Sequence, residues 1–404
     1  MIINHYAGSD EYGSKMRPFT LGQEITKLGH QVTVLAASYS HIRTKNPVIV
    51  KNFTEQYFGK LRYVFVKTPK YISPKNHFTT AVNVLSFLAS LKIKAKALHN
   101  KYLPDVIVAA SGYYLDVYAA RAIAQYNPDI KVCYEMYNLM PMILKEKGTY
   151  SKTVINIAEK FEEYAIENSD RIISFIPRGK DYLESLGFHE TNCVYFPNGA
   201  IETPARLSDP LASVIDEVRR LKRLDKFVYM YVGGMDRHNA LDDVLYASKY
   251  LHPNIQILLI GNGNYRAKLE KAIATNEINN ITILPPISKA QVIKTLRLAD
   301  ALYIGSKKSK IYEYGLPATK MLDYLMARKP IISAMYDSEN IVNSACCGIC
   351  VPCEDYRALA VALNNMSEYD VNVLKKMGEN GYAYVKKNHD YEKLTKRYIS
   401  IIRN

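Results

Sequence analysis

Residues 227–234 read FVYMYVGG, and residues 255–263 read IQILLIGNG. Each stretch is an apolar run that ends in glycines, and each is followed by a segment with helical spacing. Apolar runs without polar alternation are typical of strands that are covered on both faces, as in parallel sheets. The repeated order of strand, glycine turn and helix therefore predicts a doubly wound α/β domain.

The same alternation continues through both halves of the chain. Further strands are predicted at 281–284, 301–304 and 330–333, and in the first half at 32–35, 106–109, 131–134 and 171–175. A Pro/Gly turn, YFPNG at 195–199, separates the halves and is the predicted hinge. We therefore expect two doubly wound Rossmann-like domains, residues 1–197 and 198–385, that face each other across a cleft.

The chain has 404 residues and a formal net charge of +14. This length favours two or three domains, and the charge implies an anionic partner. An apolar run of the roughly 18 residues that a membrane-spanning helix needs is not present, and neither is a recognisable signal peptide. A cytoplasmic protein is therefore expected.

Four of the six cysteines lie in the segment CCGICVPC at 346–353, where two C-x-x-C spacings overlap. A zinc site needs four ligands that converge on the metal, and the two remaining cysteines are isolated in the sequence. We expect reduced, buried thiols here and no bound metal.

Glycine turns at strand ends are the first candidate binding features. In doubly wound sheets, ligands bind beyond the carboxyl ends of the strands, where helix N-termini offer free N–H groups to phosphate. Gly233 and Gly234 precede Arg237, whose guanidinium suits bidentate binding of a diphosphate. Gly261 and Gly263 form a second such turn. The alternative for Arg237 is an ordinary surface arginine, and the alternative for Gly261 and Gly263 is a tight turn without a ligand.

The segment YGLPATKMLDY at 314–324 is the strongest candidate, because a Gly-Leu-Pro turn leads into a predicted helix. Thr319 suits the N-cap, and the three-residue spacing places Lys320 and Asp323 on one side of the helix. A lysine for phosphate and a carboxylate for ribose hydroxyls fit a nucleotide diphosphate; a surface ion pair is the alternative. Arg237 and Lys320 would stabilise the departing nucleotide and are the predicted catalytic cations.

The chain resembles the retaining glycosyltransferases of family GT4, which have the GT-B fold, and within them the branch that builds bacterial surface polysaccharides. The resemblance covers nearly the whole chain. It rests on the order and spacing of these segments: NHYAGS at 4–9 with Arg17-Pro18, GHQVT at 29–33, PDVI at 104–107, PNG at 197–199, Gly233-Gly234 with Arg237, GNG at 261–263, ADA at 299–301, and residues 320–330.

The resemblance implies that the C-terminal domain binds a nucleotide-diphosphate sugar, with UDP as the first choice of nucleotide. The N-terminal domain would bind a saccharide acceptor that is linked to a lipid, and the sugar would be transferred with retention of configuration, without a cofactor or a metal. The final helix, about residues 386–404, would cross back onto the N-terminal domain. Gly8 and Gly13 resemble the acceptor-side glycine loop of the family, although a plain loop is also consistent.

Two departures from the family pattern concern the acidic residues. Of the two glutamates that the family often carries eight residues apart, the second position is taken by Asp323 and the first by Gly315; another register would place Lys320 at the second position. A segment that often reads E-x-x-D-x-W-P is EMYNLMP at 135–141 here. Glu135 and Asn138 are therefore the acceptor-side catalytic candidates, although Asn138 is no base and Glu135 also reads as the end of a strand.

The stretch 56–104 contains nine Lys or Arg residues and no acidic residue. A helix predicted over 78–98 has an apolar stripe followed by lysines, which suits docking on the anionic inner face of the plasma membrane. A helix that packs its stripe into the core and exposes a lysine edge explains the pattern equally well. The stripe consists of Phe78, Val82, Leu85, Leu88 and Ala89, and the lysines are Lys92, Lys94 and Lys96.

Two other functions compete with sugar transfer. The positive charge and the 33 tyrosines are compatible with nucleic-acid binding, but no recognised nucleic-acid motif is present and the glycine turns follow strands rather than a basic face, so no nucleic-acid partner is expected. An enzyme that modifies sugar nucleotides, such as an epimerase, shares the two-domain architecture. The glycine loop and the basic helix favour the transferase over it.

Overall fold

The computed structural model describes residues 1–13, 17–73, 76–200, 208–315, 319–336 and 340–403. The chain divides into two compact units. Unit 1 contains Met1–Pro197 and Tyr391–Asn404, and unit 2 contains Asn198–Asp390. The boundary at Pro197 falls inside the predicted hinge at 195–199.

Unit 1 is built on an eight-stranded sheet with the order β3-β4-β2-β1-β5-β6-β7-β8. Its strands are parallel except for the antiparallel pair β3–β4 at one edge. The strands are β1 (Ile2–Ile3), β2 (Thr33–Ala37), β3 (Thr54–Phe58), β4 (Leu61–Val66), β5 (Val106–Ala109), β6 (Lys131–Met136), β7 (Arg171–Ser174) and β8 (Cys193–Tyr195).

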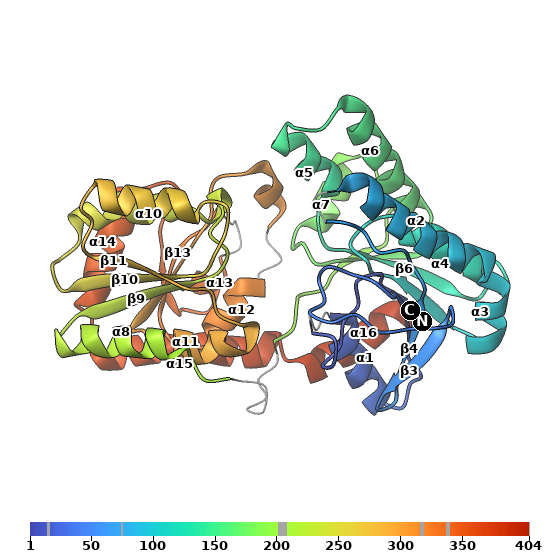
Figure 1. The fold of residues 1–404 in the computed structure, drawn as a ribbon, viewed down its shortest axis with the longest axis horizontal. Helices are drawn as coiled ribbons and strands as arrows, with labels where there is room; N and C mark the ends of the chain where they lie inside the picture. Colours follow the sequence, from blue (N-terminus) through green and yellow to red (C-terminus); the bar gives the residue numbers. More distant parts are fainter. Residues whose placement is uncertain (14–16, 74–75, 201–207, 316–318, 337–339, 404) are drawn as a thin grey trace. The chain divides into compact units, whose positions relative to one another are not determined.

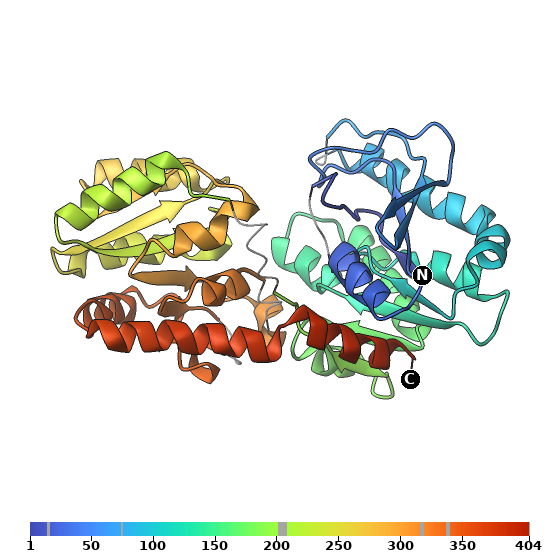
Figure 2. The same cartoon turned by 90° about the horizontal axis from the view of Figure 1, so that it is seen from below.

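Two helices from opposite ends of the chain, α1 (Arg17–Lys27) and α16 (Tyr391–Arg403), cover one face of this sheet and lie side by side (Figure 2). Phe19 and Ile25 of α1 share a buried cluster with Leu394 and Tyr398 of α16. Figure 1 shows α2, α4 and α6 on the other face. The remaining helices of unit 1 are α2 (His77–Ile93), α3 (Ala95–Tyr102), α4 (Asp116–Ala124), α5 (Met140–Lys147), α6 (Lys152–Glu167) and α7 (Gly179–Ser185).

Unit 2 has a six-stranded parallel sheet with the order β11-β10-β9-β12-β13-β14. One core lies between this sheet and α8, α11, α12, α13 and α15, and a second lies under α9, α10 and α14 (Figure 1). The strands are β9 (Phe227–Val232), β10 (Ile255–Ile260), β11 (Ile281–Leu284), β12 (Ala301–Gly305), β13 (Ile331–Ala334) and β14 (Gly348–Cys350). The α-helices are α8 (Ala212–Arg223), α9 (Leu241–Ala247), α10 (Arg266–Thr275), α11 (Val292–Leu296), α12 (Thr319–Met326), α13 (Ile341–Ser344), α14 (Tyr356–Ser367) and α15 (Val371–Asn388).

The predicted fold class of two doubly wound α/β sheets is confirmed, and three local predictions need correction. The β3–β4 hairpin was not expected. The helix predicted over 78–98 is interrupted at Lys94 and forms α2 and α3. Helix α15 continues to Asn388 and α16 begins at Tyr391, so the segment that joins unit 1 begins later than residue 386.

The apolar stripe of α2 does not pack into the core. The helix buries Asn83, Phe87 and Leu91 instead. Phe78 and Leu85 of the stripe are 78% and 57% exposed. The helix therefore packs inward as the second interpretation expected, with exposed lysines, but through a different face from the predicted stripe.

Candidate functional site

Unit 2 contains a cavity of about 450 Å³ at the carboxyl ends of β9 and β10. Its walls come from the two glycine turns, from the loop before α11 and from the first turn of α12. The lining residues are Val232, Gly233, Gly234, Ile260, Gly261, Asn262, Pro286, Ile287, Lys289, Val292, Thr319, Lys320 and Asp323. This is the place at which a doubly wound sheet binds its ligands.

The two glycine turns of this cavity pack backbone against backbone. The amide of Met235 donates to the carbonyl of Asn262 over 2.9 Å. A Cβ on Gly261 would stand 1.9 Å from the carbonyl oxygen of Gly233, and one on Gly263 would stand 2.3 Å from that of Met235. Glycines at 261 and 263 are therefore required by the close approach of the turns, whether or not a ligand is bound.

Lys320 reaches from α12 to β9 and to the 3-10 turn η2 (Arg237–Asn239). Its ammonium donates to Tyr231 Oη over 3.0 Å and to Asn239 Oδ1 over 2.7 Å. Burial lowers the pKa of Lys320 to about 8, and the charge of Asp236 opposes this effect. An ammonium of this kind, half-buried at the end of a sheet, suits an anionic ligand.

Asp323 forms an ion pair with Lys289 of the 3-10 turn η4 (Lys289–Gln291). The Asp323 side chain is 18% exposed and that of Lys289 is 76% exposed. Burial raises the pKa of Asp323, and Lys289 counteracts the rise. The sequence predicted a pair between Lys320 and Asp323 as the alternative to a site; the partner of Asp323 is Lys289 instead.

Arg237 and Thr319 differ in their relation to the cavity. Arg237 is exposed on η2, two residues before Asn239, and does not line the cavity. Thr319 lines the cavity and is the first residue of α12 rather than the residue before it. Of the predicted donor residues, only Arg237 and Gly263 lie outside the lining.

Glu135, the first acceptor-side candidate, is buried in unit 1 at the end of β6. Tyr398 donates to its Oε1 over 2.6 Å, and Tyr137 donates to Oε2. Arg17 lies 3.6 Å from Oε2 and has its guanidinium over the ring of Phe175. Burial alone would lower the pKa of Arg17, but the nearby Glu135 carboxylate and the neighbouring tyrosines raise this pKa overall. Both oxygens of Glu135 are thus engaged in a network that includes the last helix.

The other acceptor-side candidates lie in loops of unit 1. Asn138 is half-buried and follows β6. The carbonyl of Gly8 accepts a bond of 2.9 Å from Tyr63 Oη, so the loop is anchored at this point. Gly13 has φ 71°, and a Cβ there would stand 2.2 Å from Thr44 Oγ1. Residues 14–16, which continue this loop, lie outside the described residues.

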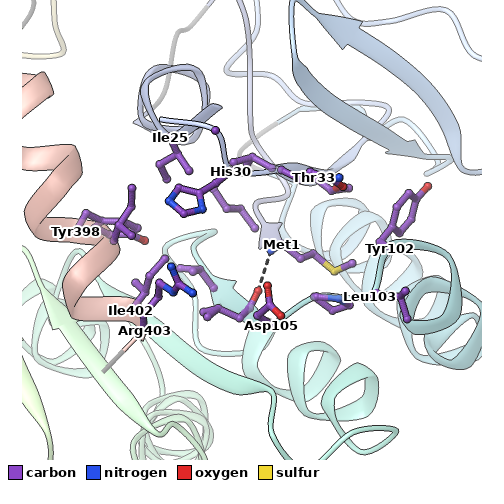
Figure 3. Close-up of a pocket in the computed structure, with 18 of the residues that line it drawn as sticks. Met1, Ile25, His30, Thr33, Tyr102, Leu103, Asp105, Tyr398, Ile402 and Arg403 are labelled. Carbon is purple, nitrogen blue, oxygen red and sulfur yellow. Dashed lines mark hydrogen bonds between the residues drawn. The ribbon is translucent and has the colours of Figure 1, made fainter. Parts of the chain in front are cut away.

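Unit 1 contains a larger cavity of about 540 Å³, which lies where its central strands begin (Figure 3). His30, Asp105 and Tyr398 surround it, and the ammonium of Met1 donates to the carbonyl of Val106 at its edge. Most of the lining lies at the amino ends of β1, β2 and β5, Tyr398 comes from α16, and none of the predicted site residues is included. Because doubly wound sheets bind ligands at their carboxyl ends, the smaller cavity in unit 2 is the better candidate.

The cysteine segment at 346–353 was the candidate for a metal site. The prediction of buried thiols holds only for Cys347; Cys350 and Cys353 are half-buried and Cys346 is exposed, so it is wrong for these three. Burial raises the pKa of Cys347 to about 12, which keeps the thiol protonated. Within the described part of the chain, no group of three His, Cys, Asp or Glu side chains is arranged to hold a metal ion.

Sequence reasoning missed three residues of the unit 2 cavity and its surroundings: Lys289, Tyr231 and Asn239. Tyr231 and Asn239 flank the Gly233-Gly234 turn, which was a usable signal. Lys289 precedes α11 and gave no signal in the sequence.

Residues 215–384 match the family model described as Glycosyl transferases group 1. No curated protein matches the chain. The matched segment covers most of unit 2 and includes the whole lining of the cavity. Over this segment, unit 2 is therefore similar to the group 1 glycosyl transferases.

Solved structures of similar fold cover the chain almost completely. Sucrose-phosphate synthase from Thermosynechococcus elongatus has a TM-score of 0.71 at 18% identity, over 100% of this chain and 97% of that one. Anabaena HepE in complex with UDP-glucose has a TM-score of 0.64 at 12% identity, over 99% and 98%. The α,α-trehalose 6-phosphate synthase from Burkholderia multivorans has a TM-score of 0.67 at 13% identity, over 100% and 96%. These similarities show the GT-B fold, and with the domain match they support a glycosyltransferase.

Proposed function

We propose that the protein transfers a sugar from a nucleotide-diphosphate donor, with UDP-sugars as the first class to test, to a saccharide linked to a lipid. The observation that carries the donor side is the unit 2 cavity, which presents Lys320 and Asp323 beside two glycine turns. HepE, which has a similar fold, was solved with UDP-glucose, and this supports the choice of nucleotide.

Each polar group in the cavity has a role in this proposal. The Lys320 ammonium binds the diphosphate, and the Asp323 carboxylate accepts hydrogen bonds from the ribose hydroxyls. Because Lys289 already pairs with Asp323, the ribose has to share that carboxylate or displace Lys289. Arg237 is exposed on η2, next to the turn that lines the cavity, and supplies a second cation for the diphosphate.

The reaction breaks the bond between the anomeric carbon and the diphosphate oxygen. A new bond forms from the acceptor hydroxyl oxygen to the same carbon with retention of configuration, and the hydroxyl proton is released. Negative charge grows on the departing nucleoside diphosphate, so Lys320 and Arg237 stabilise the transition state more than the bound donor. These cations take the place of a metal in this proposal.

A donor screen tests this function. Nucleotide sugars of different bases are incubated with the protein, and the release of free nucleoside diphosphate is measured with and without a lipid extract that contains acceptors. We expect release that depends on both donor and extract. Conversion of the donor to another sugar nucleotide without any release would indicate an epimerase-like enzyme instead.

The acceptor side is supported by the surface of unit 1. Phe78, Val82 and Leu85 form an exposed apolar stripe along α2, and Lys92 and Lys94 follow it, also exposed. Exposed apolar side chains beside lysines suit the interface of an anionic bilayer. Within the part of the chain that the structure describes, no helix is long and apolar enough to cross a membrane. We propose peripheral binding to the inner face of the plasma membrane through the stretch 56–104.

Vesicle sedimentation tests the membrane proposal. Anionic vesicles should bind the protein, neutral ones should not, and binding should weaken as salt rises because charges are screened over about 8–10 Å at physiological ionic strength. Reversal of Lys92, Lys94 and Lys96 to Glu should abolish binding while slow donor hydrolysis continues. Equal binding of this variant and the wild type would contradict the proposal.

A further inference from the structure

We propose that Tyr231 and Asn239 are positioning residues, which hold the Lys320 ammonium in place for a diphosphate and connect it to the turn that carries Arg237. This inference rests on the proposed donor role of Lys320 and adds two residues that neither the sequence motifs nor the lining of the cavity assigns.

The hydrogen bonds around Lys320 have a defined direction. The Tyr231 hydroxyl donates its proton to the carbonyl of Gly234 over 2.6 Å. Its lone pairs are therefore left to accept from Lys320 at 3.0 Å, and the Asn239 side-chain oxygen accepts at 2.7 Å. An ammonium has three N–H groups, so these contacts leave one for a ligand in the cavity that Lys320 lines.

The ammonium also lies close to the Tyr231 ring and to Gly233. Lys320 Nζ lies 4.9 Å from the centre of the buried Tyr231 ring, which attracts it by a cation–π interaction. A Cβ on Gly233 would stand 2.9 Å from Nζ and 3.0 Å from Tyr231 Oη. Lysine is normally flexible, and a lysine that is already held in one place loses less freedom when it binds a diphosphate.

Asn239 extends this arrangement to a second cation. It is the last residue of η2, and Arg237 is the first. The bond from Lys320 to Asn239 therefore ties the first turn of α12 to the turn that bears Arg237, although the two segments are 81 residues apart. Displacement of either partner disturbs the placement of both cations.

The charged groups around Lys320 define how the arrangement responds to pH. Asp236 precedes η2 and favours the charged lysine. Asp323, one turn along α12, is balanced by its pair with Lys289. Removal of a hydrogen-bond acceptor from Lys320 destabilises the ammonium, whereas a new carboxylate at position 239 stabilises it.

The first measurement uses the free protein and does not depend on activity. The rate at which an amine-reactive reagent labels Lys320 is followed by mass spectrometry against pH, and its midpoint gives the lysine pKa. We expect Tyr231→Phe and Asn239→Ala to lower the midpoint by about half a pH unit, a threefold change in the ionisation constant, and Asn239→Asp to raise it.

Tyr229→Phe is the matched control. Tyr229 lies two residues away on the same strand, is equally buried, and donates its hydroxyl proton to the carbonyl of Leu363 over 2.6 Å. The variant loses a comparable hydrogen bond without contact to Lys320. It should leave the labelling midpoint unchanged, and circular dichroism should show that all four variants are folded.

The second measurement is UDP affinity by calorimetry at pH 7. Tyr231→Phe and Asn239→Ala should weaken binding about tenfold, and Tyr229→Phe should not. Unchanged labelling midpoints in both variants would overturn the inference, and so would shifted midpoints with unchanged UDP affinity. If the wild type binds no nucleoside diphosphate, the proposed function fails, and the labelling midpoints still decide whether Tyr231 and Asn239 hold the lysine.

Discussion

Tyr398 of the last helix donates a hydrogen bond of 2.6 Å to Glu135 at the end of β6, across 263 positions of the sequence. Together with Tyr137 and Arg17, it makes the carboxylate part of a buried network. The acidic residue that the motif nominated for acceptor chemistry thus has a structural task, which is to fasten α16 to the sheet of unit 1.

This arrangement predicts the effect of removing the Glu135 charge. Glu135→Ala leaves the buried guanidinium of Arg17 without its counter-ion and should lower the free energy of unfolding by about 3–5 kcal/mol. Urea unfolding followed by circular dichroism measures the change. Glu163→Gln, at an exposed position of α6, is the control and should have little effect. A stable Glu135→Ala protein that has lost turnover would show instead that Glu135 acts in catalysis.

Asp323 should make the protein prefer nucleotides whose ribose carries its 2′ and 3′ hydroxyl groups. The wild type should bind UDP more tightly than 2′,3′-dideoxy-UDP, because only the former offers hydroxyls to the carboxylate. Asp323→Asn should weaken UDP binding about tenfold and bring the two ligands close to equal affinity. Calorimetry with both nucleotides measures this. Lys289→Ala, which removes the ion-pair partner but keeps the carboxylate, should retain the preference for UDP; a retained preference in Asp323→Asn would exclude the ribose role.

Nucleotide affinity should depend on pH through Lys320. Burial lowers the pKa of this ammonium to about 8, so the cation is present below that pH and is lost above it. UDP affinity should therefore be nearly constant between about pH 6 and 7.5 and should fall up to tenfold per unit above about 8. In Lys320→Arg the side chain stays charged over this range, and the fall should disappear. A wild-type profile that stays flat to about pH 9.5 would remove Lys320 from the diphosphate site.

The exposed stripe on α2 predicts separate effects on membrane binding and on stability. Phe78→Ser with Leu85→Ser should weaken binding to anionic vesicles at least tenfold, because about 1.5–3 kcal/mol of burial is available from each large apolar side chain. The unfolding free energy should hardly change, since both side chains are exposed. Val371→Ser, at a 71% exposed position of unit 2, is the matched control and should bind vesicles like the wild type.

Much of the fold could be predicted because the strands that lie inside each sheet are covered on both faces. Runs such as Ile255–Ile260 are apolar at nearly every position and are followed by glycines. The edge strand β3 was missed because Thr54–Phe58 is half-buried and mixes polar with aromatic residues; its neighbour β4 was missed as well, although it is an inner strand and almost fully buried. An edge strand has only one covered face and one partner, so it lacks the signal that identifies the others.

The orientation of α2 could not be predicted, because the helix has two plausible inner faces. Phe78, Val82 and Leu85 form one apolar stripe, and Phe87 and Leu91 continue another that begins with Asn83. The second faces inward because Asn83 donates to Thr68 Oγ1 over 3.1 Å and to the carbonyl of Pro69 over 2.6 Å. A polar residue whose side-chain amide donates to a neighbouring loop looks like an exposed one in the sequence.

Six of the eight residues predicted to bind the donor line one cavity, whereas the partners of these residues could not be predicted. Glycine turns after strands and the Lys320/Asp323 spacing mark the cavity from sequence. The contacts that these side chains make, from Lys289 to Asp323 and from Lys320 to Asn239, are long-range and depend on how the βα units stack side by side.

The two-piece composition of unit 1 has a consequence for biosynthesis. Leu394, Tyr398 and Ile401 of α16 belong to the same buried cluster as Phe19 of α1, and the carbonyl of Ile401 accepts a bond of 2.7 Å from Arg171. The ribosome makes these residues only after it has made all of unit 2. Unit 1 therefore cannot be completed until unit 2 has been translated, and the part of its sheet that α16 covers stays exposed on the nascent chain until then.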